Sequence, residues 1–302
     1  MTTSVVWHPA CRLHDPGPGH PERPERIDAV LEALRQSDLA SALTWCEARA
    51  ATREQVERVH PARYLDALER VARVGGGALD ADTIMSQHSW DAALAAAGVA
   101  VAAVEQAVER GSAFGATRPP GHHALAERAM GFCLLNNVVV AARHAQQLGM
   151  ARVLIVDWDV HHGNGTQALV ERDPSLCYVS IHQYPWYPGT GAEDERGVGN
   201  VFNLPRPPGL PRDAYARDLL AGVDAALAGW GRPDVLLVSA GFDSLAGDPL
   251  GGFTLTPDDM VRWTCALRER LGPAPIVSVL EGGYSLELLR AGARAHVGAL
   301  AS

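Results

Sequence analysis

Side chains that bind metals and move protons gather in the segment Asp157-Trp-Asp-Val-His-His-Gly-Asn-Gly-Thr166. In extended backbone, alternate side chains lie on one face, so Asp157, Asp159 and His161 would point the same way. Asp159 and His161 form a plausible pair of metal ligands, and Asp243, far along the chain, is placed to be the third. Two carboxylates, one imidazole and an open position are typical of a catalytic metal site. The alternative, that these carboxylates only cap neighbouring loops, is less favoured because they occur together after strands.

Two other segments carry side chains that transfer or donate protons. Arg118-Pro-Pro-Gly-His-His-Ala124 places His122 and His123 in a loop fixed by proline and glycine, and histidine is the usual general base near neutral pH. Leu280-Glu-Gly-Gly-Tyr284 ends in a phenol, which can donate to a developing negative charge beside a metal. Taken alone, an incidental histidine pair and a tyrosine packed against a turn are the favoured interpretations. The metal-binding segment elsewhere shifts the balance toward catalysis.

Alternating strand and helix patterns must position these segments. Unbroken apolar runs predict buried parallel strands at 153–156, 176–181, 235–238 and 276–280. Helical patterns are found at 24–36, 90–110, 134–147, 212–229, 257–271 and 286–300. The alternation predicts an α/β fold, a three-layer αβα sandwich with a largely parallel sheet, as one domain over residues 1–302. Because Asp157, Asp243 and Tyr284 lie in segments that follow strands, we expect a single site at the carboxyl edge of the sheet.

The composition limits the partners that the chain can have. It holds 26 Lys and Arg against 35 Asp and Glu, and the net charge of −9 argues against a nucleic-acid partner. Its five cysteines form no CxxC pair, and the N-terminus lacks a signal-peptide pattern, so we expect a cytoplasmic protein. The apolar stretch from Ala92 to Val104 is too short to span a bilayer, so no membrane partner is expected. A homo-oligomer remains possible.

Five ordered motifs give the chain a close resemblance to a known family. They are segments 118–124, 131–137 (Gly-Phe-Cys-Leu-Leu-Asn-Asn), 157–166, 239–250 and 280–284, and the likeness extends from about His20 to Tyr284. The chain resembles the histone deacetylase family, most of all its bacterial class II-type branch, with the acetoin-utilisation proteins and acetylpolyamine amidohydrolases. The resemblance implies an arginase-like fold and a zinc-dependent enzyme that removes acetyl groups from acetyl-lysine peptides or proteins. An acetylated polyamine is the alternative substrate.

The resemblance also implies a role for each matching residue. The metal ligands would be Asp159, His161 and Asp243. The catalytic residues would be His122, His123, Tyr284, Asp157 as the support of His122, and Asn164 as the neutral partner of His123, where class I members have an aspartate. The substrate channel would be formed by Gly131, Phe132, Tyr187 and Leu250, with Asp82 at its rim and Arg26 in an internal channel behind the metal.

Metal ions beyond the catalytic one are implied by the same resemblance. The catalytic ion would be Zn²⁺, although the same ligands accept Fe²⁺. A structural K⁺ would be held largely by backbone carbonyls of Asp157, Asp159, His161, Ser180 and Ile181. A second, weaker K⁺ loop would involve Val170, Asp173, Leu176 and Asn200.

Two other functions remain open on the sequence alone. A ureohydrolase-like enzyme with two manganese ions would need a further carboxylate two residues after Asp243, where the chain has Leu245 instead. A catalytically dead reader of acetyl-lysine is disfavoured by the intact Tyr284, His122 and His123. The number of metal ions per chain, one against two, distinguishes a deacetylase from the first alternative. A turnover assay on an acetyl-lysine peptide distinguishes it from the second.

Overall fold

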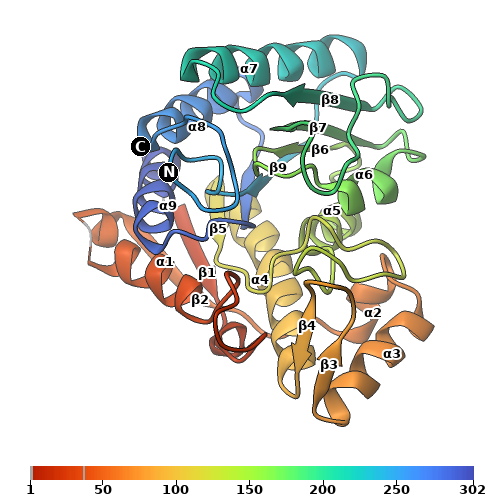
Figure 1. Cartoon of the computed structure of the whole chain (residues 1–302). Helices are drawn as coiled ribbons and strands as arrows, with labels where there is room; N and C mark the ends of the chain where they lie inside the picture. The colour runs from red at the N-terminus through yellow and green to blue at the C-terminus, as the bar shows by residue number, and fades with distance from the viewer. Residues whose placement is uncertain (1–2, 37) are drawn as a thin grey trace.

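An eight-stranded sheet runs through the computed structural model, which describes residues 3–36 and 38–302 (Figure 1). The strand order is β2-β1-β5-β10-β9-β6-β7-β8, and every neighbouring pair is parallel. These strands are β1 (Thr3–Trp7), β2 (Leu43–Glu47), β5 (Ser112–Gly115), β6 (Val153–Asp157), β7 (Leu176–Gln183), β8 (Val201–Arg206), β9 (Val235–Ala240) and β10 (Ile276–Leu280). A separate antiparallel ribbon is formed by β3 (Gly76–Ala78) and β4 (Ile84–Ser86).

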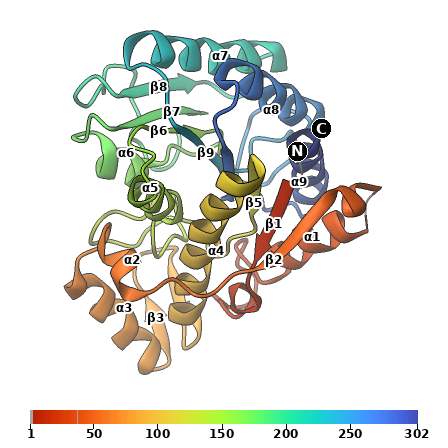
Figure 2. The ribbon, with the colours of Figure 1, turned by 180° about the vertical axis from the view of Figure 1, so that it is seen from behind.

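Helices cover both faces of this sheet, which confirms the three-layer αβα sandwich (Figures 1 and 2). One face is covered by α4 (Ser89–Arg110), α5 (Asn137–Gln147) and α6 (Asn164–Val170). The other face carries α1 (Glu25–Arg35), α7 (Arg212–Gly229), α8 (Pro257–Leu271) and α9 (Leu286–Ala301). Beside the sandwich, α2 (Arg53–Glu57) and α3 (Ala62–Arg73) pack with the ribbon around a second, smaller apolar cluster.

Local sequence explains how these elements begin and pack. Thr256 caps α8 in a reciprocal capping box with Asp259, and Pro257 fills the first turn, where a missing N–H costs nothing. Gly98 lies in the middle of α4, where a Cβ atom would come within 2.0 Å of the carbonyl oxygen of Arg49. The glycine therefore lets the segment around Arg49 cross directly over the helix.

Four adjacent central strands bring the predicted site segments together. The order β5-β10-β9-β6 places four loops side by side at the carboxyl edge of the sheet. The histidine pair lies in the segment between β5 and α5, Tyr284 follows β10, Asp243 follows β9, and Asp159 with His161 follows β6. Residues far apart in the chain therefore meet at one edge, where ligands bind in folds of this kind.

The predicted elements are largely confirmed, with some corrected bounds. The helix predicted from residue 134 begins at Asn137, because the side chain of Asn136 caps it by accepting a hydrogen bond from the amide of Val139 at 3.1 Å. The sequence patterns do not predict strands β1, β2, β3, β4, β5 and β8 or helices α2, α3 and α6. The short β5, Ser-Ala-Phe-Gly, shows why: it lacks β-branched residues and gains its stability from pairing with β1 and β10.

Helix α4 alone, among the described residues, is long and apolar enough to cross a membrane by length and composition. Its apolar window is 67% buried inside the protein, and it packs against β1, β5 and α5. Its apolar character is therefore explained by its place in the core.

Candidate active site

Asp159, His161 and Asp243 form a compact cluster of buried ligand atoms. One ligand atom from each lies within 4.8 Å of the others. The Nδ1 atom of His161 is 3.0 Å from Asp159 Oδ1 and 3.3 Å from Asp243 Oδ2. The backbone fixes both carboxylates, because the amide of Gly282 donates to Asp159 Oδ2 at 2.8 Å and that of Val160 donates to Asp243 Oδ1 at 3.0 Å. The three side chains predicted to be metal ligands are thus brought together in one geometry.

The charges and the free oxygen of this cluster favour a bound cation. Burial and the nearby charge of Asp159 raise the pKa of Asp243 to about 7. Burial alone would lower the pKa of His161, but the two carboxylates raise it to about 10. Asp243 Oδ2 is buried and has no hydrogen-bond partner within the described residues. An unpartnered oxygen, a second carboxylate and an imidazole are a donor set that fits a divalent ion such as Zn²⁺.

The two histidines of the pair have unequal partners. His122 Nδ1 lies 3.1 Å from Asp157 Oδ2, which also accepts a hydrogen bond from the Tyr178 hydroxyl at 2.8 Å. His123 Nδ1 lies 2.8 Å from the amide oxygen of Asn164. The rings are neighbours, with centroids 4.0 Å apart. One histidine therefore faces a carboxylate and the other a neutral amide.

These environments set opposite charge states for the histidines. Burial opposes charge on His122, but Asp159 and Asp157 raise its pKa to about 10. Burial, together with the imidazoles of His122 and His161, lowers the pKa of His123 well below its ordinary value. His123 is thus the histidine that stays neutral and can accept a proton.

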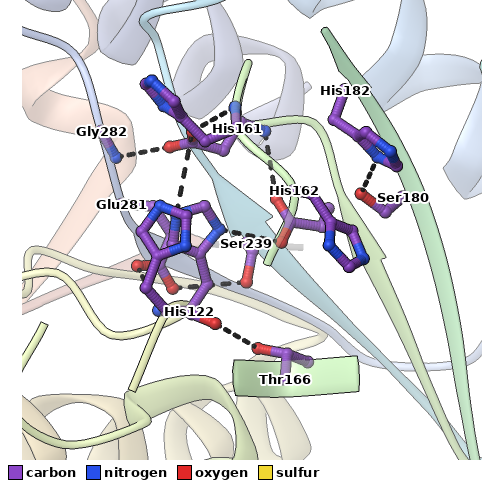
Figure 3. A network of polar contacts seen from close by, with 12 residues as sticks. His122, His161, His162, Thr166, Ser180, His182, Ser239, Glu281 and Gly282 are labelled. Carbon is purple, nitrogen blue, oxygen red and sulfur yellow. Dashed lines mark hydrogen bonds and ion pairs between the residues drawn. The ribbon is translucent and has the colours of Figure 1, made fainter. Parts of the chain in front are cut away.

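Glu281 holds the histidine loop through hydrogen bonds to its backbone (Figure 3). Its Oε2 accepts hydrogen bonds from the amides of Gly121 at 2.7 Å and His122 at 3.2 Å, and Ser239 Oγ donates to Oε1 at 3.3 Å. On the other side of the loop, Thr166 donates its amide to the His122 carbonyl at 3.0 Å. Glu281 is not among the residues predicted for the site, although a charged residue directly after a buried strand is a usable signal.

Tyr284 reaches the same site from the end of β10. Its backbone amide, with that of Ser285, donates to Asp248 Oδ2 at 2.7 and 3.0 Å, which fixes the turn that carries it. The phenol ring packs edge-on against Phe132, with centroids 5.7 Å apart. Burial raises the pKa of the Tyr284 hydroxyl well above its ordinary value, so this hydroxyl keeps its proton and can donate it.

A cavity of about 200 Å³ opens onto these groups. Its lining consists of Asp82, His123, Gly131, Phe132, His161, Trp186, Tyr187, Leu250 and Tyr284. The structure therefore brings together the residues predicted for the channel wall and its rim, and adds Trp186, which donates its indole N–H to the Leu250 carbonyl at 3.0 Å. An apolar tube that ends at polar groups can take an alkyl chain with a polar tip.

Arg26 lies behind Tyr284 rather than in the cavity. It is fully buried, and its guanidinium stacks over the Tyr284 ring at 4.9 Å from the centroid. It donates to the carbonyls of Gly283 at 2.7 Å and Glu281 at 2.5 Å, and to Glu22 at 2.9 Å. Glu22 also pairs with Arg118, at 2.7 and 3.0 Å. Glu22 bridges the two arginines, and no sequence pattern predicts this because only the fold brings the three residues together.

The fold and the site together define a metal-dependent hydrolase, and comparison with known proteins gives its family. The histone deacetylase domain matches residues 20–300. A probable deacetylase of Methanothermobacter thermautotrophicus is 39% identical over 292 residues, covering 94% of this chain and 86% of the relative. The human polyamine deacetylase HDAC10 is 38% identical over 309 residues, covering 95% of this chain and 44% of the relative. The crystal structure of the HDA15 HD domain superposes with a TM-score of 0.93 at 36% identity, covering 99% of this chain and 88% of that one.

The chain belongs to the histone deacetylase family, whose members are zinc-dependent hydrolases. It is a deacetylase, and the cluster of Asp159, His161 and Asp243 is the place for the divalent ion that this chemistry needs.

Proposed function

We propose that this enzyme removes the acetyl group from acetyl-lysine side chains. The observation that carries the proposal is the cavity of about 200 Å³, whose lining includes His123, Tyr284 and, through His161, the metal-ligand cluster. Phe132 and Tyr187 would flank the methylene chain of a lysine, and the acetamide would reach the cluster. A divalent ion bound there would polarise the acetamide carbonyl and acidify a water molecule.

The protein groups supply the proton transfers. Nδ1 of His123 donates to the acceptor-only oxygen of Asn164, so its Nε2 is unprotonated and can take the proton of the attacking water. The Tyr284 hydroxyl donates to the carbonyl oxygen as negative charge develops there, which is worth several kcal/mol. His123 then returns the proton to the leaving amine as the C–N bond breaks. The products are acetate and a free lysine side chain.

His122 acts through its charge and its position. Its bond to Asp157 fixes the ring beside His123, and its positive charge keeps the neighbouring imidazole neutral. Partners of this kind typically matter about 10- to 100-fold in activity.

The substrate preference rests on the charge of the cavity lining. Asp82 is the one carboxylate that lines the cavity outside the metal-ligand cluster, among the described residues. A polyamine carries further ammonium groups beyond its acetamide, and these would need more carboxylates at the entrance. The lining therefore favours acetyl-lysine. An acetylated polyamine is the second candidate, supported by the likeness to a relative named as a polyamine deacetylase.

A side-by-side assay tests this preference. The zinc-loaded enzyme is given an acetyl-lysine peptide and acetylated spermidine, and kcat/KM is measured for both. We expect the higher value for the peptide. A kcat/KM for acetylated spermidine well above that of every peptide tried would replace acetyl-lysine by the polyamine.

The proposal includes a structural K⁺ close to the catalytic ion. Asp157 and Ser180 are paired in register on neighbouring strands, and their backbone carbonyls would supply two of its ligands. Backbone carbonyls of Asp159, His161 and Ile181 would complete the shell. Carbonyl oxygens in this arrangement replace the hydration shell of K⁺.

A further inference from the structure

The side-chain amide of Asn200 lies among three backbone carbonyls. Its Nδ2 atom is 2.9 Å from the carbonyl oxygen of Val170, 2.9 Å from that of Asp173 and 2.7 Å from that of Leu176. Val170 ends α6 and Leu176 begins β7, so these carbonyls belong to the turn that joins the two elements, in the part of Figure 1 where α6, β7 and β8 meet. Asn200 is 1% exposed.

Three acceptors exceed what one amide nitrogen can serve. A side-chain NH₂ group carries two hydrogens, so at least one of the three contacts must share a hydrogen with another. Converging carbonyl dipoles concentrate negative charge at one point, and proteins use such rings of carbonyls to hold dehydrated monovalent cations. The cage formed by Val170, Asp173 and Leu176 thus has the character of a cation site, with a nitrogen at its centre.

The neighbouring contacts fix which end of the amide faces this cage. The Asn200 Oδ1 atom accepts a hydrogen bond from the amide of Val198 at 3.2 Å. The backbone carbonyl of Asn200 is itself engaged, since it accepts from the amide of Tyr178 at 2.9 Å. A reversed amide would place its oxygen against three carbonyl oxygens and its NH₂ against an N–H group. The orientation with nitrogen in the cage is therefore the stable one.

We infer that the Asn200 amide takes the place of a monovalent cation in this cage, so that the chain binds no K⁺ there. The second K⁺ site that the family resemblance implies does not fit these residues, because the side-chain nitrogen of Asn200 already occupies the space among the three carbonyls. The side-chain nitrogen carries only partial positive charge, but it is tethered and is present at every salt concentration. The inference does not depend on the proposed substrate.

The position of the cage explains what the Asn200 amide stabilises when it takes the place of an ion. Helix α6 begins at Asn164, which holds His123, and ends at Val170, in the cage. Asn200 ties that end of the helix to the starts of β7 and β8, and its hydrogen bond adds to the one that the Val170 carbonyl accepts from the amide of Asp173 at 2.9 Å. The element that positions His123 is thereby anchored without an ion.

Two variants of the full chain distinguish the effect of the amide nitrogen from the effect of the volume that the side chain fills. Asn200→Ala removes the nitrogen and leaves room for an ion, whereas Asn200→Leu removes the nitrogen and keeps the volume. The melting temperature of each is measured in potassium chloride and in tetramethylammonium chloride of equal ionic strength. We expect both variants to melt a few degrees below the parent protein in tetramethylammonium. Only in Asn200→Ala should potassium raise the melting temperature by more than it does in the parent protein. Any effect of potassium at the predicted structural K⁺ site near Ser180 is common to all three proteins.

Crystals grown in rubidium chloride locate the ion directly. An anomalous Rb⁺ peak among the carbonyls of Val170, Asp173 and Leu176 is expected in Asn200→Ala and not in the parent protein. A peak at that point in the parent, with the Asn200 side chain turned away, would overturn the inference even if both variants failed to fold. A folded Asn200→Ala protein would overturn the inference as well if it showed no Rb⁺ peak and if potassium raised its melting temperature no more than that of the parent.

Discussion

His123 donates a hydrogen bond from Nδ1 to the amide oxygen of Asn164 over 2.8 Å. The bond leaves Nε2 of His123 free, while the neutral amide does not hold a second proton on the ring. Its neighbour His122 is bound instead to the carboxylate of Asp157. The difference in partners assigns the general base to His123.

Alanine substitutions separate the two histidines. His123→Ala removes the base and should lower kcat by about 10²- to 10⁴-fold. His122→Ala removes a supporting charge and should cost about 10- to 100-fold. The zinc content of each purified variant, measured alongside, should be unchanged, because neither residue is a ligand. Greater residual activity in His123→Ala than in His122→Ala would reverse the assignment.

Asn164→Asp should move the pH dependence of catalysis in a defined direction. A carboxylate in place of the amide would stabilise the protonated form of His123 and raise its pKa. The base must be neutral to act, so the acid limb of the pH profile of kcat/KM should shift to higher pH. If the acid limb stayed at the same pH or moved to lower pH, in a variant that keeps its melting temperature, the group that titrates there would not be His123.

Glu22 should be a principal support of the loops around the site. It is fully buried between Arg26, which holds the carbonyls near Tyr284, and Arg118, which precedes the histidine pair. Glu22→Gln leaves two buried guanidinium groups without a counter-charge and should cost about 3 kcal/mol of unfolding free energy. Glu32→Gln, in α1 and in an exposed pair with Arg290, is the control and should change stability by less than about 0.5 kcal/mol. Urea denaturation measures both.

The same carboxylate gives a pH signature of stability. Burial alone would raise the pKa of Glu22, but Arg118, His14 and Arg26 lower it to about 2, below the ordinary value of 4.5. The unfolded chain therefore binds the proton more readily, and the stability from Glu22 is lost as pH falls from 4.5 toward 2. The melting temperature of Glu22→Gln should fall less steeply than that of the parent in this range. Parallel slopes would show that Glu22 is not stabilised as a carboxylate.

Gly131 should be intolerant of any side chain because of its contact with His123. Its φ is +55°, and a Cβ atom would lie 2.4 Å from His123 Cδ2. Gly131→Ala should displace the imidazole and lower kcat by about 10²-fold. Gly149→Ala is the matched control, since that glycine also has a positive φ, +91°, but nothing within 4 Å of the added atom. The control should lose stability and keep its kcat, and equal kcat values in both variants would contradict the crowding argument.

The metal ligands and the histidine pair could be predicted from the sequence because most of these residues lie close together in short segments. Asp159 and His161 are two residues apart after an apolar strand, and that spacing alone indicates a shared face. Asp243 could be added because it follows another strand. The structure then shows the three side chains together.

The supports of the site could not be predicted in the same way. Glu22 and Arg118 are 96 residues apart, and Gly121 and Glu281 are 160 apart, so no local pattern links them. The family resemblance implied a potassium loop that includes Asn200, and only the folded chain shows its side-chain amide among the carbonyls. Pairings of this kind depend on the strand order rather than on spacing in the chain.

The central claim, that one metal site in this chain hydrolyses acetyl-lysine, is tested most directly by a zinc titration of activity. Metal-free enzyme is given increasing zinc, and the acetate released from an acetyl-lysine peptide is measured at each step. The rate should rise in proportion to zinc up to one ion per chain and then stay level, because Asp159, His161 and Asp243 form one site. A plateau at two ions per chain, or no acetate release at any zinc level, would contradict the account.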